Sequence, residues 1–304
     1  MITFFTICTA EQYPFAALLG QSLPSDARFF VGLVTGKIAT TNVISAEELG
    51  LPNWHDMRER YDDDALIAAC KPFFADFFLQ QPNTNQVVYF DPTVQVFGDI
   101  SLIYQELETA SILLTPCLLR PMWRVEYGDE KHFLNTGMYN AGFFALQNDE
   151  NTAAFLRWWQ ARAHDRAHFD LCHGQNHDQL WLNLVPVYFQ GVKIIKNQAW
   201  NVGLHNLHER VLTQRGGSWW VNNQEPLLFF NFRECVANHH SIQTILEKSG
   251  AKSLLSSYLN NLKTIPSIFS IYQKLHPIVP AWKRFLRREL TNIIAGIDQF
   301  PLTY

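Results

Sequence analysis

The sequence lacks the patterns that mark secreted and membrane-spanning proteins. Its five cysteines are widely scattered and none stands in a C-x-x-C pair, which indicates reduced thiols in a cytoplasmic protein and not a disulfide framework. No apolar run reaches the ~18 residues of a membrane-spanning helix. Residues 1–14, MITFFTICTAEQYP, contain neither a basic segment nor a cleavage site, so we expect no signal peptide.

The sequence also lacks a surplus of positive charge. Its formal net charge is −4 at pH 7, whereas nucleic-acid-binding proteins usually carry a basic excess that neutralises phosphates. This excludes a general nucleic-acid binder and leaves a small anionic ligand open. Residues 6–14, TICTAEQYP, have no glycine, which argues against a nucleotidyltransferase, because that class is expected to carry a glycine-rich phosphate loop near the N-terminus.

The N-terminal part of the chain instead alternates strand and helix patterns. Residues 1–8, MITFFTIC, predict a strand, and residues 12–23, QYPFAALLGQSL, predict a helix that tolerates Pro14 in its first turn. A second strand is predicted at 28–36 and a third at 83–91. This βαβ opening favours an α/β fold with a mainly parallel sheet, and 304 residues are enough to bury a sizeable core.

Between the second and third strands, an acidic triplet precedes a long apolar pattern. Asp62, Asp63 and Asp64 stand before residues 65–81, ALIAACKPFFADFFLQQ. Carboxylates at a helix start cap unpaired N–H groups and favour the helix dipole, so we interpret the triplet as a solvated cap. Pro72 within the pattern predicts a kink or two shorter helices.

The second half of the chain predicts further strands and helices. Residues 110–119 predict a strand, and 133–148 predict two short strands interrupted by small and amide residues. A helix is predicted at 151–167, whose Trp158 and Trp159 we assign to the core in preference to a stacking platform. Residues 177–189 predict a short helix ended by Pro186, before a strand at 191–196. The pattern changes near 238, which divides the chain into a domain at 1–237 and a helical extension at 238–304.

The stretch 87–100, VVYFDPTVQVFGDI, is the first candidate for a functional site. Its apolar run fits a buried strand that stops at Asp91. A carboxylate at the C-terminal end of such a strand lies where α/β sheets place ligand chemistry. The alternative is a turn residue fixed by Pro92.

Six stretches in this order resemble the GT-A glycosyltransferases, especially bacterial relatives of the family 8 type, which includes lipopolysaccharide and glycogenin-like sugar transferases. They span roughly residues 1 to 233, and they read TICTAEQYPFAALLGQSL, ACKPFF, YFDPTVQVFGDI, NTGMYNAGFFAL, NHDQLWLNLVP and WNVGLHNLHER. The resemblance implies a Rossmann-like nucleotide-sugar-binding domain. It also implies the transfer of a sugar from a nucleotide diphosphate.

The resemblance further implies a divalent cation held by an Asp-x-Asp turn and a later histidine, because hard cations prefer carboxylate and phosphate oxygens. Asp91 matches the first aspartate of that motif. Thr93 stands in place of the second aspartate, and Asn231 stands in place of the histidine. A hydroxyl and an amide still coordinate Mn²⁺ or Mg²⁺, but they bring no charge. We therefore expect weak, atypical metal binding by these three residues.

Two further motifs resemble the sugar-binding part of the family. Asp178 and Gln179 match an Asp-Gln pair near the transferred sugar, where a carboxylate stabilises developing positive charge; the alternative is a helix N-cap. Asn140, Ala141 and Gly142 match a strand segment that lets the substrate approach the backbone, and the alternative is a bulge between strands.

Donor contacts are implied at three more positions. Tyr13 matches an aromatic residue that stacks on the nucleotide base, and the backbone of Thr9 and Ala10 is placed to read the base edge. Tyr13 is equally consistent with a core residue. Lys71 matches a basic residue close to the diphosphate, although the following proline is also compatible with a lysine that ends a helix turn in solvent.

Two other clusters of residues offer competing or additional interpretations. Cys172, His173, His177 and Asp178 include metal-binding residue types, but one loop with one thiol is a poor match to a closed zinc site. The C-terminal residues 271–297 place basic side chains among apolar ones, at Lys283, Arg284, Arg287 and Arg288. Such a helix either packs on the main domain or lies on an anionic membrane surface.

The sequence thus predicts a cytoplasmic, bacterial-type glycosyltransferase of glycan biosynthesis. Its expected partners are a nucleotide-sugar donor, expected to be a UDP-sugar, and a hydroxyl of a glycan or glycolipid acceptor. The family resemblance implies retention of anomeric configuration. The alternative is a non-catalytic descendant that binds a nucleotide-sugar or glycan, which Thr93 and Asn231 favour.

Overall fold

A computed structural model describes residues 1–36, 38, 40–51, 53–121, 130–171, 174–237 and 242–265, together with 282, 285–286, 289–290 and 293. The chain forms two compact units, Met1–Tyr272 and Gln273–Tyr304. All helices and strands named below belong to the first unit.

A seven-stranded sheet with the order β10-β6-β7-β4-β1-β2-β3 forms the centre of this unit. Its strands are β1 (Ile2–Thr9), β2 (Arg28–Thr35), β3 (Val43–Ser45), β4 (Gln86–Phe90), β6 (Ile112–Pro116), β7 (Tyr139–Gln147) and β10 (Val192–Ile194). All neighbouring pairs are parallel except those of β7, which runs antiparallel to both β4 and β6. The expected α/β fold with a mainly parallel sheet is confirmed.

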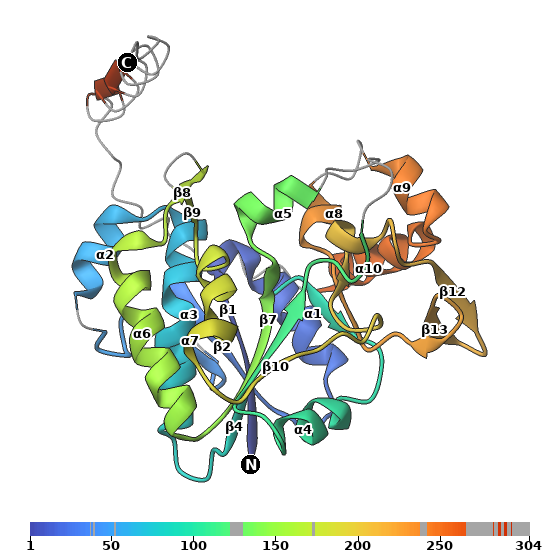
Figure 1. Ribbon diagram of the computed structural model, residues 1–304, viewed down its shortest axis with the longest axis horizontal. Helices are drawn as coiled ribbons and strands as arrows, with labels where there is room; N and C mark the ends of the chain where they lie inside the picture. The colour runs from blue at the N-terminus through green and yellow to red at the C-terminus, as the bar shows by residue number, and fades with distance from the viewer. Residues whose placement is uncertain are drawn as a thin grey trace. The chain divides into compact units, whose positions relative to one another are not determined.

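Helices cover both faces of the sheet (Figure 1). One face packs against α2 (Trp54–Arg60), α3 (Asp63–Leu79) and α6 (Glu150–Arg166), and the other against α1 (Tyr13–Ser22) and α4 (Ser101–Leu107). Successive strand residues point to opposite faces, so Phe5 and Phe144 belong to the first layer while their neighbours Phe4 and Phe143 belong to the second.

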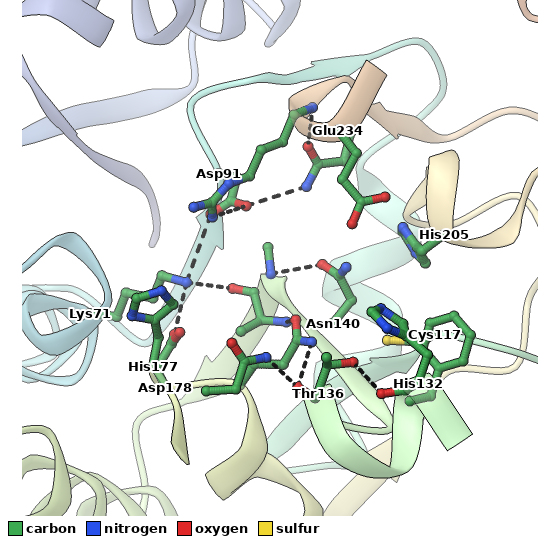
Figure 2. Close-up of a pocket in the computed structure, with 17 residues that line it drawn as sticks. Lys71, Asp91, Cys117, His132, Thr136, Asn140, His177, Asp178, His205 and Glu234 are labelled. Atoms are coloured by element: carbon green, nitrogen blue, oxygen red, sulfur yellow. Dashed lines mark hydrogen bonds and ion pairs between the residues drawn. The ribbon is translucent and has the colours of Figure 1, made fainter. Parts of the chain in front are cut away.

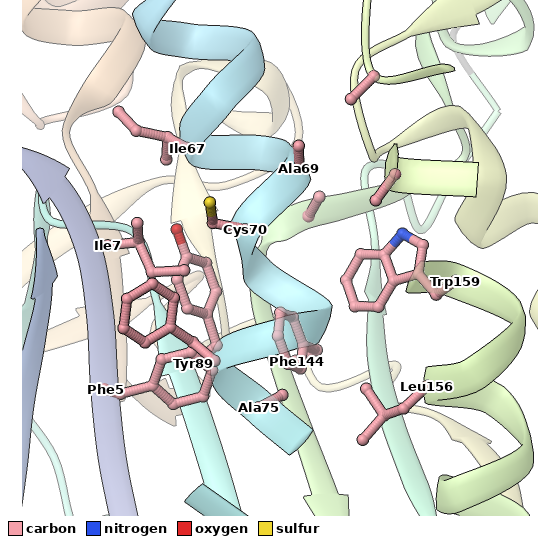
Figure 3. Packing of buried hydrophobic residues seen from close by; sticks show 14 of the residues in the cluster. Phe5, Ile7, Ile67, Ala69, Cys70, Ala75, Tyr89, Phe144, Leu156 and Trp159 are labelled. Atoms are coloured by element: carbon pink, nitrogen blue, oxygen red, sulfur yellow. The ribbon is translucent and has the colours of Figure 1, made fainter. Parts of the chain in front are cut away.

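Aromatic rings in contact with one another fill the layer between the sheet, α3 and α6 (Figure 3). The ring centroids of Phe5 and Tyr89 are 5.2 Å apart, those of Tyr89 and Phe144 are 5.0 Å apart, and those of Phe144 and Trp159 are 5.3 Å apart. Trp159 is fully buried, and Trp158 packs partly buried on the edge of the same cluster. The assignment of both tryptophans to packing and not to a stacking platform agrees with these contacts.

Helix α3 runs unbroken through Pro72, so the expectation of two shorter helices is wrong. Proline removes one N–H from the helix ladder, but Cys70, Phe74 and Phe78 bury apolar surface on both sides of it. Gln160 Nε2 of α6 also donates to the Pro72 carbonyl at 3.4 Å. Tertiary packing therefore outweighs the lost backbone hydrogen bond.

Two expectations for the middle of the chain are corrected. Residues 133–148 form the end of α5 (Glu130–Thr136) and one strand, β7, in place of two strands. Phe133 buries its ring, and Thr136 Oγ1 donates to the His132 carbonyl at 2.9 Å, which fits a helical turn. Residues 180–184 form a 3-10 turn, and Pro186 lies in the first turn of α7 (Val185–Tyr188), so it starts a helix and does not end one.

The later part of the unit is built on a second set of short strands. A three-stranded sheet joins β11 (Val202–Gly203), β15 (Phe229–Asn231) and β5 (Val94–Val96), and another joins β12 (Leu212–Arg215), β13 (Ser218–Val221) and β14 (Glu225–Pro226). The remaining elements are β8 (Phe169–Asp170), β9 (Gln175–Asn176), α8 (Arg233–Ala237), α9 (Gln243–Lys248) and α10 (Lys252–Thr264). Leu254 of α10 shares an apolar cluster with Leu18 of α1. The boundary near residue 238 stays a prediction.

Two further observations concern the helices and the cysteines. Among the described residues, no helix combines the length and apolar character that crossing a membrane requires. Cys8, Cys70, Cys117 and Cys235 are buried and take part in no disulfide; that the protein works in a reducing compartment stays a prediction. Lys283, Arg284, Arg287 and Arg288 of the expected basic helix lie outside the described residues.

The start of α3 yields a stability prediction. Asp62 is its N-cap, and the carboxylate accepts from Ala65 N at 2.9 Å, as the acidic triplet predicted. We expect Asp62→Ala to lower the free energy of unfolding by about 1 kcal/mol in urea denaturation. Asp62→Asn keeps a capping oxygen and should lose less than half as much. Equal losses in the two variants would show that the capping hydrogen bond does not cause the loss.

Candidate functional site

The polar residues of the predicted motifs meet at the edge of the sheet where β4 ends. Because β7 is antiparallel to β4, its first residues lie beside the last residue of β4 and not at the opposite edge. The Asp91 N–H donates to the Gly142 carbonyl at 2.8 Å, which fixes this proximity. Segments around residues 91 and 140, distant in sequence, therefore form one site at the edge that α/β proteins use for ligands.

A pocket of about 270 Å³ opens at this edge. In Figure 2, Lys71, Asp91 and Asp178 lie on one side of it and Cys117, His132 and His205 on the other, with Asn140 and Thr136 between them. The other lining residues are Phe133, Ala141, Gly142, Asn176, His177, Gln179, Asn231, Arg233 and Glu234. Of the residues predicted for the site, Lys71, Asp91, Asn140, Ala141, Gly142, Asp178, Gln179 and Asn231 line this pocket.

Lys71 carries a buried ammonium group at the floor of the site. Its side chain is 3% exposed, so the alternative of a lysine in solvent is wrong. Lys71 Nζ lies 2.8 Å from Asp178 Oδ2 and 3.8 Å from Asp91 Oδ1, and it donates to the Ala141 carbonyl at 2.9 Å. It also lies 4.9 Å from the centroid of the Tyr89 ring. One cation thus joins two carboxylates and the start of β7.

Asp91 serves both as a turn residue and as a member of the pocket. Its carbonyl accepts from Val94 N at 3.0 Å, which is the expected turn. Its carboxylate accepts from the Tyr89 hydroxyl at 2.8 Å. Burial alone would raise the pKa of this carboxyl, but Lys71 and Arg233 lower the pKa below its ordinary value. Asp91 is therefore charged at neutral pH.

Thr93 and Asn231 are held together beside Asp91. Thr93 Oγ1 donates to Asn231 Oδ1 at 3.0 Å, and the backbone N–H of Arg233 donates to the same oxygen at 3.0 Å. The amide nitrogen of Asn231 faces Asp91 Oδ2 at 3.4 Å. Antiparallel pairing of β15 with β5 places Asn231 opposite Val94, which accounts for this proximity. The three residues predicted as metal ligands are thus neighbours, and metal binding by them stays a prediction.

Arg233 is a site residue that the sequence comparison missed. Its Nη1 lies 3.7 Å from Asp91 Oδ2, and its Nη2 lies 3.3 Å from Asp64 Oδ1. The side chain is 51% exposed and lines the pocket. The family resemblance draws attention to position 231 of the stretch 227–234, whereas the residue that reaches Asp91 with a charge is the arginine two positions later.

Asp178 and Gln179 are both positioned by the protein. The 3-10 turn that follows has Gln179 as its N-cap without a side-chain cap, so the N-cap alternative for Asp178 is wrong. Asp178 instead pairs with Lys71 and is 4% exposed. Gln179 Oε1 accepts from Ala141 N at 3.2 Å, and its Nε2 donates to the Thr136 carbonyl at 2.9 Å. The glutamine therefore ties β7 to α5.

Asn140 and Gly142 shape the wall that separates the two sides of the pocket. Asn140 Oδ1 accepts from Gly142 N at 2.9 Å. A Cβ atom on residue 142 would lie 2.5 Å from Asn231 Nδ2 and 2.8 Å from Asp91 Oδ2. Only glycine allows these polar groups to approach so closely. The pairing of β7 with β6 is irregular at this segment: Leu114 faces Phe144 and Pro116 faces Tyr139, so residues 140–143 of β7 lie opposite the single residue Thr115. The bulge that was the alternative interpretation is therefore present here, and the same segment lines the pocket.

The residues predicted to bind the base lie at the end of β1. Thr9 caps the 3-10 turn Ala10–Gln12: Gln12 N donates to Thr9 Oγ1, and Thr9 N donates to Gln12 Oε1, both at 3.3 Å. Tyr13 opens α1 and packs half-buried on a small apolar cluster. None of Thr9, Ala10 and Tyr13 lines the pocket described here, so their contact with a nucleotide stays a prediction.

The second side of the pocket is less charged. Burial, together with the nearby charge of Arg210, lowers the pKa of His205 to about 3, so this imidazole is neutral at pH 7. Burial likewise raises the pKa of the Cys117 thiol and that of the Glu234 carboxyl. The pocket is thus ionic around Lys71, whereas the His205 imidazole on the other side is neutral at pH 7, which favours a ligand with charge at one end.

A zinc site gains no support from these contacts. Cys172 and His173 lie outside the described residues. His177 Nδ1 is 3.1 Å from the Ala167 carbonyl, and Asp178 pairs with Lys71. Within the part of the chain that the structure describes, no group of three His, Cys, Asp or Glu side chains is arranged to hold a metal ion.

Comparisons with known proteins find distant similarity. No protein-family model matches the chain. The uncharacterized protein YfnD of Bacillus subtilis (strain 168) is 28% identical over 186 residues, which are 58% of this chain and 57% of that protein. The match therefore spans little more than half of the length of that relative.

Solved structures with similarity to the chain are glycosyltransferases. The galactosyltransferase LgtC, in complex with donor and acceptor sugar analogues, is 14% identical, with 67% of this chain and 76% of that chain covered and a TM-score of 0.40. The bifunctional glycosyltransferase WbbM is 10% identical, with 89% and 51% covered and a TM-score of 0.44. Similarity at this level assigns no activity to the chain.

The burial of His205 predicts an acid-sensitive stability. In the unfolded chain this residue titrates near 6.5, and in the folded chain near 3. Between these values the unfolded state binds a proton that the folded state does not, so stability falls as the pH is lowered. The contribution is at most about 1.4 kcal/mol per pH unit.

We expect His205→Gln to make the loss of unfolding free energy between pH 6.5 and pH 4 shallower than in the unaltered protein. Urea denaturation at several pH values measures this slope. His55 is an exposed histidine, with 83% of its side chain accessible, and His55→Gln should leave the slope unchanged. An identical slope in His205→Gln and the parent would contradict the assignment.

Proposed function

We propose that this chain is a glycosyltransferase that moves a sugar from a nucleotide-sugar, a UDP-sugar, to a hydroxyl of a glycan or glycolipid. The observation that supports this most is the buried cluster in which Lys71 joins Asp91 and Asp178. These three residues come from three sequence stretches, and each stretch separately resembles a glycosyltransferase motif. Their convergence on one pocket, beside Asn140 and Gln179, is what a common donor site requires.

The charges of the pocket suit the reaction. The bond between the anomeric carbon and the diphosphate oxygen breaks, and its electron pair leaves with the diphosphate. The acceptor oxygen forms the new bond to that carbon and loses its proton. Positive charge develops on the sugar and negative charge on the diphosphate. Asp178 is suited to stabilise the first, and the exposed positive charge beside Asp91 is suited to stabilise the second.

The size of the pocket suits one part of the nucleotide-sugar donor and not the whole molecule. At about 270 Å³ it lies just below the roughly 300–1,000 Å³ typical of small-molecule sites. We assign the sugar and the adjacent phosphate to it. The nucleoside then extends towards the end of β1, where Thr9, Ala10 and Tyr13 lie.

Three finer features belong to the same proposal. Transfer proceeds with retention of anomeric configuration, the protein acts in the cytoplasm, and the C-terminal basic segment contacts a membrane that holds the acceptor. Each follows from the sequence resemblance or from composition. A non-catalytic nucleotide-sugar binder is the competing candidate, and turnover separates the two.

The test is donor turnover by Asp178→Asn. A panel of UDP-, GDP-, CDP- and dTDP-sugars first identifies the donor by thermal shift and by slow hydrolysis, because ligands that bind the native state raise its stability. At a saturating concentration of that donor, we expect Asp178→Asn to lose ~10²-fold or more in transfer or hydrolysis. This is the loss typical of removing one preorganised electrostatic contact. Binding of the free nucleoside diphosphate should be nearly unchanged.

Asp165 provides the matched control, because it is an exposed aspartate in an ion pair with Arg166. Asp165→Asn should turn over donor at the parental rate. Parental turnover in Asp178→Asn would remove Asp178 from the catalytic residues. Binding of a donor without any turnover by the parent would favour the non-catalytic candidate.

A further inference from the structure

The oxygens where a divalent cation would bind are already engaged by donors of the protein. Asp91 Oδ1 accepts from the Tyr89 hydroxyl at 2.8 Å, and Asp91 Oδ2 faces Asn231 Nδ2 at 3.4 Å. The Asn231 oxygen accepts from Thr93 Oγ1 and from the Arg233 backbone. Asn231 therefore presents an N–H group, and not an oxygen, to the space beside Asp91.

This arrangement does not fit Mg²⁺ or Mn²⁺. Hard cations require about six oxygen ligands at about 2.0–2.6 Å, and most of their protein ligands are carboxylates. Here Asp91 is the one carboxylate of the three residues, and a cationic side chain, Arg233, lies 3.7 Å from its Oδ2. A metal ion would have to displace a guanidinium group of the same charge sign.

Lys71 does not supply an accessible positive charge. An ammonium group has three N–H donors, and Lys71 Nζ is surrounded by Asp178, the Ala141 carbonyl and Asp91. Its side chain is also 3% exposed. Its role is to hold the two carboxylates and β7 in place.

Arg233, unlike Lys71, supplies an accessible positive charge. Its side chain is 51% exposed on the pocket, and its two carboxylate partners, Asp91 and Asp64, orient the guanidinium without covering it. A guanidinium has five donors in a planar fork that matches two phosphate oxygens. Of the lysine and arginine side chains that the structure describes in the pocket lining, Arg233 is the one with an exposed head group.

We propose that the Arg233 guanidinium, and not a bound divalent cation, neutralises the departing diphosphate, so that sugar transfer by this chain requires no metal. The inference rests on the proposed glycosyltransferase function. Asp91 then acts as the anchor of Arg233 and no longer as a metal ligand. Thr93 and Asn231 hold the backbone of Arg233 in register with Asp91.

The experiment compares the full chain in excess EDTA and in excess Mn²⁺. It measures binding of UDP, GDP, CDP and dTDP by thermal shift, and hydrolysis or transfer from the corresponding nucleotide-sugars. We expect the parent to turn over its donor at rates that agree within about twofold in the two buffers. Arg233→Gln should lose ~10²-fold in both buffers. Arg233→Lys should recover part of the loss, because it keeps the charge but not the two-pronged geometry.

A gain of metal dependence makes the test sharper. The double variant Arg233→Gln with Thr93→Asp removes the guanidinium and adds a second carboxylate, so Mn²⁺ should raise its turnover at least tenfold over its rate in EDTA. Arg166 has a side chain 53% exposed and paired with Asp165, and Arg166→Gln should match the parent in both buffers. Each variant's thermal midpoint without ligand shows that it is folded.

The outcomes separate this inference from the proposed function. Turnover by the parent that EDTA abolishes and Mn²⁺ restores would overturn the role of Arg233 and leave the glycosyltransferase intact. Parental turnover in Arg233→Gln would do the same. No binding and no turnover with any donor in either buffer would overturn the proposed function and this inference together.

Discussion

A buried ammonium group holds the candidate site together. Lys71 on α3 contacts Asp178 at 2.8 Å and the Ala141 carbonyl at 2.9 Å, and Asp91 lies 3.8 Å away. Moving such charges out of water is costly, and removing one partner leaves the others uncompensated, at a cost of about 3–5 kcal/mol. The buried charges of Lys71, Asp178 and Asp91 are therefore compensated only in the folded state, where helix α3, strand β7 and the segment before Leu180 pack together. The fold and the site depend on each other through this one side chain.

The direction of β7 is the second constraint. A parallel strand in that place would bring Gln147 to the end of β4, whereas the antiparallel strand brings Asn140, Ala141 and Gly142 there. The Asp91 N–H donates to the Gly142 carbonyl, and the Gly142 N–H donates to Asn140. The missing side chain of Gly142 allows Asp91 and Asn231 to meet above it. The charged half of the pocket thus results from one strand reversal and one glycine.

Much of the fold is predictable from the sequence because it depends on local patterns. Strand β1, helix α1 and strand β2 follow from short apolar runs separated by turn residues, and Asp91 follows from its place after the apolar run of β4. The sequence leaves open whether Lys71 lies in the site or in solvent. Helix α3 is apolar on nearly all sides, so its pattern does not tell which face is buried. Helix α5 was predicted as a strand, since its stability comes from the burial of Phe133 and not from a periodic pattern.

The site was predictable only where a motif pointed to it. Arg233 is a site residue because its guanidinium lies close to Asp91. The pairing of β15 with β5 creates this proximity, and no local sequence pattern shows it. The same holds for His205, which is buried in the folded chain and lies near the charge of Arg210. Residues that act through contacts between distant strands are those that sequence reasoning is least able to find.

A crystal structure with bound UDP, grown without divalent cations, tests the donor-site assignment most directly. The assignment requires the diphosphate oxygens to lie about 3 Å from the Arg233 guanidinium, with the distal phosphate directed into the pocket beside Asn140 and the uracil near the end of β1. UDP bound at another surface, or bound only when a metal ion lies between Asp91 and Thr93, would contradict it.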